Sequence, residues 1–439
     1  AENPGIEFKL ELDRERYLAQ RNNLVYLKAS VIAKGHSELS RRQPVNLAFV
    51  VDRSGSMAGE PIQYLKKGLV EALDRLDKED LVTVIAFGSE AETLFPSQQL
   101  DQIKNRNLLI QQIEAEGGAA PFEALNFAAA QLRRNLSSTP YNRILFMTDG
   151  PATNGPREDE DFLRLIDSLA REGITVSTIG YGESFSEDLL REMATKGAGD
   201  YHFANSGDSL IEAFSQEIMR MNQVVARDLN IEIRFAGGIR AEEIFGRTGE
   251  LNRDTVKLSL GQLLNGENKY VLVTANVPAR LSFLESIKVA EATLTYLPVG
   301  DANTVEAIIA QEVRAGFTSY LPAVTDSINH DVAFSVISHE IAESMEIAIA
   351  FADEGNLDKA LRELKGTLRD AKNLNLDLED PAIDALIEDL ENFIADMESR
   401  GLNRIDRKVM TLRVFQAIKQ RSLGSSQEKS EIANPSEQP

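Results

Sequence analysis

Hydrophobic and polar residues follow two different periods along this chain. Residues 6–33 alternate with a period of two, which is typical of strands with one buried face, and the same alternation returns from about residue 226. Phe8, Leu10 and Leu12, for example, share one face. We expect residues 1–42 and 224–300 to form one discontinuous antiparallel β-sandwich, with separate small β units as the alternative.

The segment between these two stretches, residues 43–223, alternates apolar runs with amphipathic stretches. The apolar runs predict strands buried on both faces, at Val45–Val51, Val82–Phe87, Arg143–Met147 and Ile174–Ile179. The amphipathic stretches predict helices, at Pro61–Leu76, Pro121–Leu136, Glu158–Arg171, Ser186–Lys196 and Asp208–Met221. The predicted fold class is therefore α/β: a Rossmann-like, doubly wound domain inserted in the β-sandwich.

The last part of the chain changes to helical periodicity. We expect a helical region over residues 301–422, with helices at Val305–Ala315, His330–Asp353, Leu357–Asn373, Ala382–Arg400 and Arg404–Arg421. His339 and Glu340 lie on one of these helices and look like part of a zinc hydrolase pattern, but no second histidine follows, so we expect a solvated helix face. Residues 423–439 are polar and predict a disordered tail.

Composition narrows the classes of partner. Among 439 residues, 47 Lys plus Arg stand against 69 Asp plus Glu, for a formal net charge of -22. This charge repels nucleic acid and anionic membranes, and no apolar run approaches transmembrane length, so we expect neither nucleic-acid binding nor membrane insertion. The absence of cysteine excludes thiol catalysis, disulfides and thiolate zinc sites. We expect a cytoplasmic protein, with an extracytoplasmic location as the alternative.

One loop carries the clearest candidate chemistry. The buried run Leu47–Val51 ends in Asp52, and two hydroxyls follow at alternate positions, Ser54 and Ser56. A second buried run closes on Asp149. Because the carboxyl ends of parallel strands meet at one edge of a sheet, these four side chains predict an oxygen-rich site for a small, hard divalent cation such as Mg²⁺.

These motifs resemble the von Willebrand factor A-type family. The resemblance rests on Asp-Arg-Ser-Gly-Ser-Met at 52–57, Thr-Asp-Gly at 148–150 and Ile-Thr-Val-Ser-Thr-Ile-Gly-Tyr-Gly at 174–182, and it covers roughly residues 43–222. It implies a Rossmann-like fold with a metal-ion-dependent adhesion site. Carried over residue by residue, the metal ligands would be Asp52, Ser54, Ser56 and Asp149, with Mg²⁺, Mn²⁺ or Ca²⁺ as the cation.

The chain departs from the family in the second loop of that site. Members usually read Gly-Gly-Thr, whereas this chain reads Gly117-Gly118-Ala119, so Gly118 and Ala119 would form a rim without a hydroxyl ligand. Three explanations stand open: loss of tight metal binding, a water molecule at the vacant position, or a deliberate replacement that disables the site. Thr153, a few residues past Asp149, is a candidate to substitute for the missing hydroxyl ligand, although nothing in its spacing requires this.

We expect a non-enzymatic interaction or adhesion-type protein that binds an acidic partner residue, Asp or Glu, through the cation. The alternative is a metal-independent scaffold or self-assembling structural subunit, which the alanine at position 119 favours. A metal-dependent hydrolase ranks last, because the sequence offers no histidine or surplus carboxylate placed to act as a general base.

Overall fold

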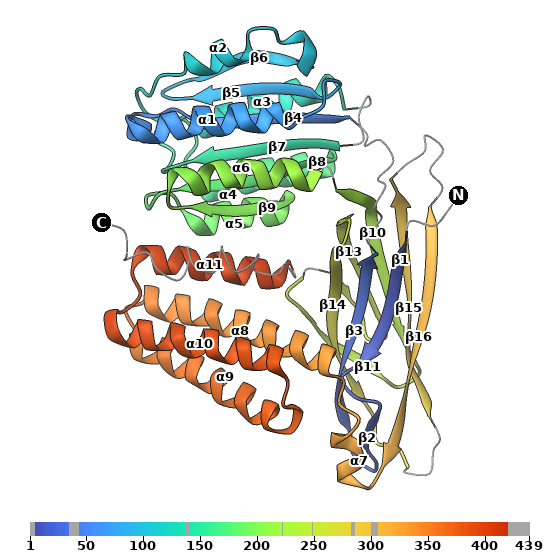
Figure 1. The fold of residues 1–439 in the computed structure, drawn as a ribbon. Coiled ribbons are helices and arrows are strands. Elements are labelled where there is room, and N and C mark those ends of the chain that lie inside the picture. Colours follow the sequence, from blue (N-terminus) through green and yellow to red (C-terminus); the bar gives the residue numbers. More distant parts are fainter. Residues whose placement is uncertain are drawn as a thin grey trace. The chain divides into compact units, whose positions relative to one another are not determined.

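A computed structural model describes residues 5–34, 44–136, 141–221, 223–247, 249–281, 286–299 and 306–419. The chain divides into two compact units, which we describe separately (Figure 1). The α/β unit consists of Ser40–Gln223 together with Arg404–Leu412. The other unit, the sandwich unit, consists of Ala1–Leu39, Val224–Asn403 and Arg413–Pro439.

The α/β unit is built on a six-stranded sheet in the order β6-β5-β4-β7-β8-β9. Its strands are β4 (Val45–Asp52), β5 (Leu81–Phe87), β6 (Ala91–Gln99), β7 (Tyr141–Thr148), β8 (Ile174–Tyr181) and β9 (Ala198–Ala204). All neighbouring strands pair in parallel except β5 and β6, which are antiparallel. The strands predicted from continuous apolar runs are confirmed, and every residue of β4 is buried.

Helices cover both faces of this sheet, as Figure 1 shows. They are α1 (Glu60–Asp74), α2 (Arg106–Gln111), α3 (Pro121–Arg133), α4 (Asp159–Arg171), α5 (Glu187–Lys196) and α6 (Gly207–Met221). On one face α1 and α6 lie side by side, and Phe214 of α6 packs against Phe49 of β4 with ring centroids 6.1 Å apart. The predicted doubly wound α/β fold is therefore confirmed, because each of its helices turns an apolar stripe to the sheet.

The sandwich unit contains two β-sheets. One has the order β1-β3-β14-β11, formed by β1 (Ile6–Leu12), β3 (Asn23–Ala33), β14 (Asn268–Val277) and β11 (Arg240–Phe245). The other has the order β12-β13-β10-β15-β16-β2, formed by β12 (Glu250–Leu251), β13 (Thr255–Leu264), β10 (Val224–Phe235), β15 (Ile287–Pro298), β16 (Ala307–Thr318) and β2 (Arg16–Leu18). β14 pairs with β3 along its whole length, so strands from both sides of the α/β segment share one sheet. A single apolar core draws residues from both sheets.

One predicted helix is wrong. Residues 307–315, expected to be helical within Val305–Ala315, belong to strand β16 and pair antiparallel with β15. The strand reaches Thr318, so the sheet extends beyond the expected boundary at residue 300. The strand does alternate, with Ile309 and Val313 partly buried against the core and Ala315 and Phe317 buried. Ile308 on the other face is 66% exposed, and the run of adjacent apolar residues at 307–310 obscures this alternation in the sequence.

The helices after β16 are α7 (Leu321–Thr325), α8 (His330–Asp353), α9 (Leu357–Leu378), α10 (Pro381–Arg400) and α11 (Arg404–Ile418). The four long helices expected over residues 330–418 are confirmed, whereas the tail predicted over 423–439 lies outside the described residues. Gly355, with φ at 78°, makes the turn between α8 and α9. None of the described helices is long and apolar enough to cross a membrane.

Buried charges fix two of these helices. In the α/β unit, Lys408 of α11 is fully buried and its Nζ lies 2.5 Å from Glu187 Oε2. In the sandwich unit, Lys28 of β3 is paired with Asp331 of α8 at 2.6 Å. Beside Lys28, the ring of Tyr270 meets His339 of α8 edge to face at 5.7 Å. The expectation that His339 lies on a solvated face is wrong, since this side chain is only 4% exposed.

His339 gives this packing a specific pH dependence. Burial, with smaller contributions from Arg247 and Lys28, lowers the pKa of His339 from 6.5 to about 4. The unfolded chain therefore takes up a proton more readily than the folded chain between these pH values. The stability that neutral His339 contributes is complete above about pH 6.5 and declines as the pH falls toward about 4, by about 3 kcal/mol.

We predict that NMR titration places the His339 ring near pH 4. Replacing His339 by Leu should reduce the loss of urea resistance between pH 7 and pH 4.5. A ring that titrates near 6.5 would contradict the burial.

Candidate metal centre

The first half of the site is the turn that follows β4. Asp52 is the last residue of β4, and its carboxylate is completely buried. The backbone N–H of Ser54 donates to Asp52 Oδ1 at 2.8 Å, which bends the chain into a short 3-10 turn, Gly55–Met57. Gly55 N–H donates to Gly117 O at 3.0 Å, and a Cβ at Gly55 would lie only 3.3 Å from that oxygen. Glycine is therefore favoured where the two loops meet.

The second half comes from the end of β7, which pairs with β4 in parallel. Thr148 donates its hydroxyl to Asp52 Oδ2 at 2.7 Å. Ser56 Oγ donates to Asp149 Oδ1 at 2.9 Å, and the Oγ atoms of Ser54 and Ser56 lie 3.0 Å apart. The structure thus brings together all four side chains singled out in the sequence. Sequence reasoning missed the role of Thr148, although a hydroxyl at the end of a buried strand beside Asp149 was a usable signal.

The ionised forms of the Asp52 and Asp149 carboxyl groups are both disfavoured in the folded protein. Burial raises the pKa of Asp52, against the hydrogen bonds from Ser54 and Thr148, which lower it. Burial and then the charge of Asp52 raise the pKa of Asp149 from 3.8 to about 6. Among the described residues, no Lys, Arg or His forms an ion pair with either carboxylate. Arg53, which lies between Asp52 and Ser54, is turned to Glu116 at 2.8 Å instead.

This donor set fits a small divalent cation. Octahedral Mg²⁺ binds oxygens at about 2.1 Å, which places neighbouring ligand oxygens about 3.0 Å apart. The Ser54–Ser56 and Ser56–Asp149 oxygen pairs are 3.0 and 2.9 Å apart, so their spacing suits two edges of such an octahedron. All donors are oxygens, as hard cations require. Asp52, Ser54, Ser56 and Asp149 are the residues that would hold the ion, directly or through water.

The rim of the site is formed by Gly117, Gly118 and Ala119. Ala119 is 4% exposed and offers only a methyl group. Its backbone N–H donates to Thr153 Oγ1 at 2.7 Å, and Thr153 Oγ1 donates to Asn154 Oδ1 at 3.1 Å. No described hydrogen bond joins Thr153 to the four candidate ligands, and its hydroxyl is already engaged with the rim.

A second group of metal-ligand types lies in the same unit. Ligand atoms of Asp200, His202 and Glu217 are all within 4.8 Å of one another. Arg143 binds Glu217 at 2.9 Å, however, and Arg220 lies 3.6 Å from Asp200, so guanidinium charges balance both carboxylates. His202 Nε2 lies 2.8 Å from Glu217 Oε1. We interpret the group as a buried ion-pair network that fixes α6 to β7 and β9.

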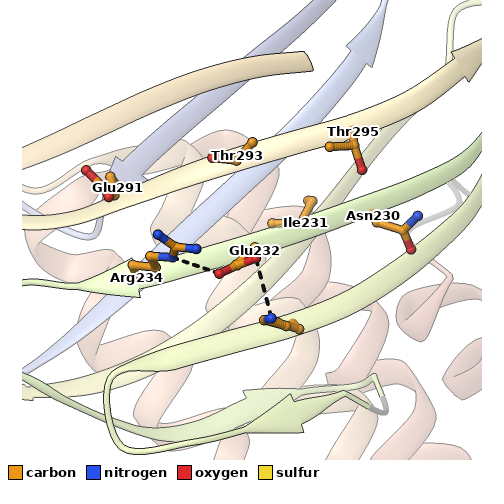
Figure 2. A pocket seen from close by; sticks show the side chains of 8 residues that line it. Asn230, Ile231, Glu232, Arg234, Glu291, Thr293 and Thr295 are labelled. Atoms are coloured by element: carbon orange, nitrogen blue, oxygen red, sulfur yellow. Dashed lines mark hydrogen bonds and ion pairs between the residues drawn. The ribbon is translucent and has the colours of Figure 1, made fainter. Parts of the chain in front are cut away.

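A hollow on the six-stranded sheet of the sandwich unit is polar and lies among strands β10, β13 and β15 (Figure 2). Its charges are paired: Glu232 binds Arg234 at 2.7 Å and lies 3.6 Å from Lys257, and Glu291 pairs with Lys288. Thr293 and Thr295 line the same hollow. These features are typical of a solvated sheet face rather than of a ligand site.

Comparison with known proteins places the candidate centre in a defined domain. Residues 46–217 match the model of the von Willebrand factor type A domain, and the chain contains a domain of this type. An uncharacterized protein of Synechocystis is 28% identical over 210 residues, covering 48% of this chain and 49% of its own length. Inter-alpha-trypsin inhibitor heavy chain H4 of Homo sapiens is 29% identical over 168 residues, covering 36% of this chain and 18% of its own. The chain thus spans half or less of these relatives.

Two solved structures resemble most of the chain. A von Willebrand factor type A protein from Catenulispora acidiphila has a TM-score of 0.67 at 18% identity and covers 88% of this chain and 89% of its own. The ArnB paralog VWA2 from Sulfolobus acidocaldarius has a TM-score of 0.60 at 17% identity, with 96% and 100% covered. At these identities the likeness shows the fold alone, and it extends beyond the A-type domain.

We predict that Asp52→Asn lowers the pKa of Asp149 below about 6 but keeps it above 3.8, because the neighbouring charge disappears while burial stays. Carboxyl ¹³C NMR of aspartate-labelled protein in chelator measures this directly. Asp101→Asn, which changes an exposed acid of the same unit, is the control and should leave Asp149 unaffected. An Asp149 pKa that is unchanged or higher in Asp52→Asn would show that the two carboxylates are not coupled.

Proposed function

We propose that this protein, whose residues 46–217 form a von Willebrand factor type A domain, is a non-enzymatic interaction protein that binds an acidic side chain of a partner through a divalent cation. Asp52, Ser54, Ser56 and Asp149 hold the cation, and Gly118 and Ala119 shape the rim. The observation that carries the proposal is the meeting of Asp52 and Asp149 without a balancing cationic side chain among the described residues.

The chemistry of the donors favours an acidic partner. Two of the four proposed ligands, Ser54 and Ser56, are neutral, and the rim adds no oxygen side chain at position 119. A bound divalent cation would supply the positive charge to which a partner's carboxylate can bind. Ser56 is exposed and Asp149 is partly exposed, so the open side of the site faces solvent, where a partner can approach.

The arrangement gives little support to an enzyme. The three described histidines are engaged elsewhere: His202 contacts Glu217, His330 contacts Asp380, and His339 packs on Tyr270. His202 is the one described histidine of the α/β unit, and its ring pairs with Glu217 rather than with Asp52, where a general base would be needed. Hydrolysis by the pure protein that requires both Mg²⁺ and Asp52 would overturn the non-enzymatic assignment.

Ala119 offers no hydroxyl ligand, which favours a second candidate function, that of a scaffold that assembles without metal. Light scattering in Mg²⁺ and in chelator distinguishes the two. A self-assembly that chelator leaves unchanged, in protein that also fails to bind Mg²⁺ by calorimetry, would favour the scaffold.

We predict that Ala119→Thr increases Mg²⁺ affinity about tenfold, because it adds a hydroxyl that can bind the cation or order a bound water. Ala119→Val is the matched control, since valine has the shape of threonine without the hydroxyl. Isothermal titration calorimetry of both variants separates the effect of the oxygen from that of added volume. Equal affinities in the two variants would show that position 119 does not face the cation.

We predict that a displayed random-peptide library, selected on the whole protein in Mg²⁺, yields binders that carry an essential Asp or Glu and dissociate in chelator. Replacing that acid by Asn or Gln should abolish binding, because the amide has no charge. The Asp52→Ala protein should retain none of these peptides. Binders that persist in chelator, or that contain no acidic residue, would contradict the proposed function.

A further inference from the structure

The turn after Asp149 is tied to the rim by a compact set of hydrogen bonds. The N–H groups of Thr153 and Asn154 both donate to Ala119 O, at 3.0 and 2.8 Å. In return, Ala119 N–H donates to Thr153 Oγ1 at 2.7 Å. Both backbone polar groups of Ala119 are thus bound by this turn. We call residues 153–154 and 117–119, with Ser89, the clasp.

Ser89 closes the clasp from a third loop. Its hydroxyl accepts from Gly118 N–H at 2.9 Å, and its carbonyl accepts from Asn154 Nδ2 at 2.9 Å. The segments are packed closely: a Cβ at Gly118 would lie 2.5 Å from Thr153 Oγ1 and 2.7 Å from Asn154 Oδ1. Only glycine leaves room for this contact. The rim is therefore held in one position by side chains outside the four candidate ligands.

Asp149 lies between two fixed points. On one side, the hydroxyl of Thr148 binds Asp52 Oδ2 at 2.7 Å and Gly150 O at 3.0 Å. On the other side, four residues along, Thr153 binds the rim. A short segment anchored at both ends has little freedom, so the position of the Asp149 carboxylate depends on both threonines.

We propose that Thr153 is a positioning residue for the candidate metal centre: its hydroxyl, clamped on the Ala119 amide, fixes the rim against the turn that carries Asp149. The expected effect of Thr153 on cation affinity rests on the proposed function. The clasp itself is supported by the hydrogen bonds alone. The sequence suggested Thr153 as a substitute ligand for the hydroxyl that Ala119 lacks. In the structure Thr153 has a different role, because its hydroxyl oxygen bonds to Ala119 N–H of the rim and to Asn154 Oδ1 rather than to the four candidate ligands.

The experiment compares Thr153→Val, which keeps the shape and removes the hydroxyl, with Thr153→Ser, which keeps the hydroxyl. Thr195→Val is the matched control, since Thr195 is exposed in the same unit and, within the described part of the chain, its hydroxyl bonds only to Arg191 O of its own helix. On the full chain, calorimetry measures Mg²⁺ affinity, and ¹³C NMR in chelator measures the pKa of Asp149. Loss of one such hydrogen bond should weaken Mg²⁺ binding about three- to tenfold in Thr153→Val. Thr153→Ser should restore it to within about twofold.

The two readouts separate this inference from the proposed function. If the unaltered protein binds no Mg²⁺, the proposed function fails, but the NMR readout still tests the clasp. In that case Thr153→Val should move the Asp149 titration and the amide signals of Gly118 and Ala119, and Thr153→Ser should return them. A Thr153→Val protein with unchanged Asp149 titration and unchanged rim signals would overturn the proposal, as would equal effects of Thr153→Val and Thr195→Val.

Discussion

The parallel pairing of β4 with β7 is the constraint on which the candidate centre depends. Val51 is registered against Met147, so Asp52, one residue on, and Asp149, two residues on, leave the sheet at the same edge. The two carboxylates cannot move apart, because Asp52 is buried and Asp149 lies on a short turn that is hydrogen-bonded at both ends. Burial raises the pKa of Asp149, and the repulsion from Asp52 that the packing of the sheet maintains raises it further, to about 6. A bound proton or cation removes this repulsion.

The inner part of this fold could be predicted from local pattern. Strands β4 and β7 are continuous apolar runs because both of their faces are covered, and a run of this kind has few other interpretations. The edge strands β6 and β9 were not predicted, since exposed residues interrupt β6 and the polar residues Asp200 and His202 interrupt the apolar run of β9. β16 was predicted as a helix because few of its residues are fully buried, and the adjacent apolar residues at 307–310 obscure the alternation of its core-facing positions. Tertiary pairing, which the local sequence does not encode, decides these segments.

The candidate site, like the fold, is predicted from local pattern in one part and decided by tertiary contacts in the other. The positions of Asp52, Ser54 and Ser56 follow from one turn, and Asp149 follows from the rule that parallel strands end together. The contacts of Thr148 and Thr153 join segments 96 and 34 residues apart, so no spacing along the chain indicates them. Thr153 shows the limit most clearly: its chemistry and proximity suggested a ligand, whereas its geometry makes it a support for the rim.

Other buried charges in the protein give the contrast that supports a ligand site at Asp52 and Asp149. Lys28 meets Asp331 at 2.6 Å, Glu217 meets Arg143 at 2.9 Å, and Lys408 meets Glu187 at 2.5 Å. In each case an opposite charge from another element offsets the cost of burial. At the end of β4 the fold instead places a second carboxylate beside the first and directs the nearby guanidinium of Arg53 toward Glu116. The protein thus neutralises its buried charges at Lys28, Glu217 and Lys408 but leaves two carboxylates together at one strand edge. These are the electrostatics of a cation site rather than of a structural ion pair.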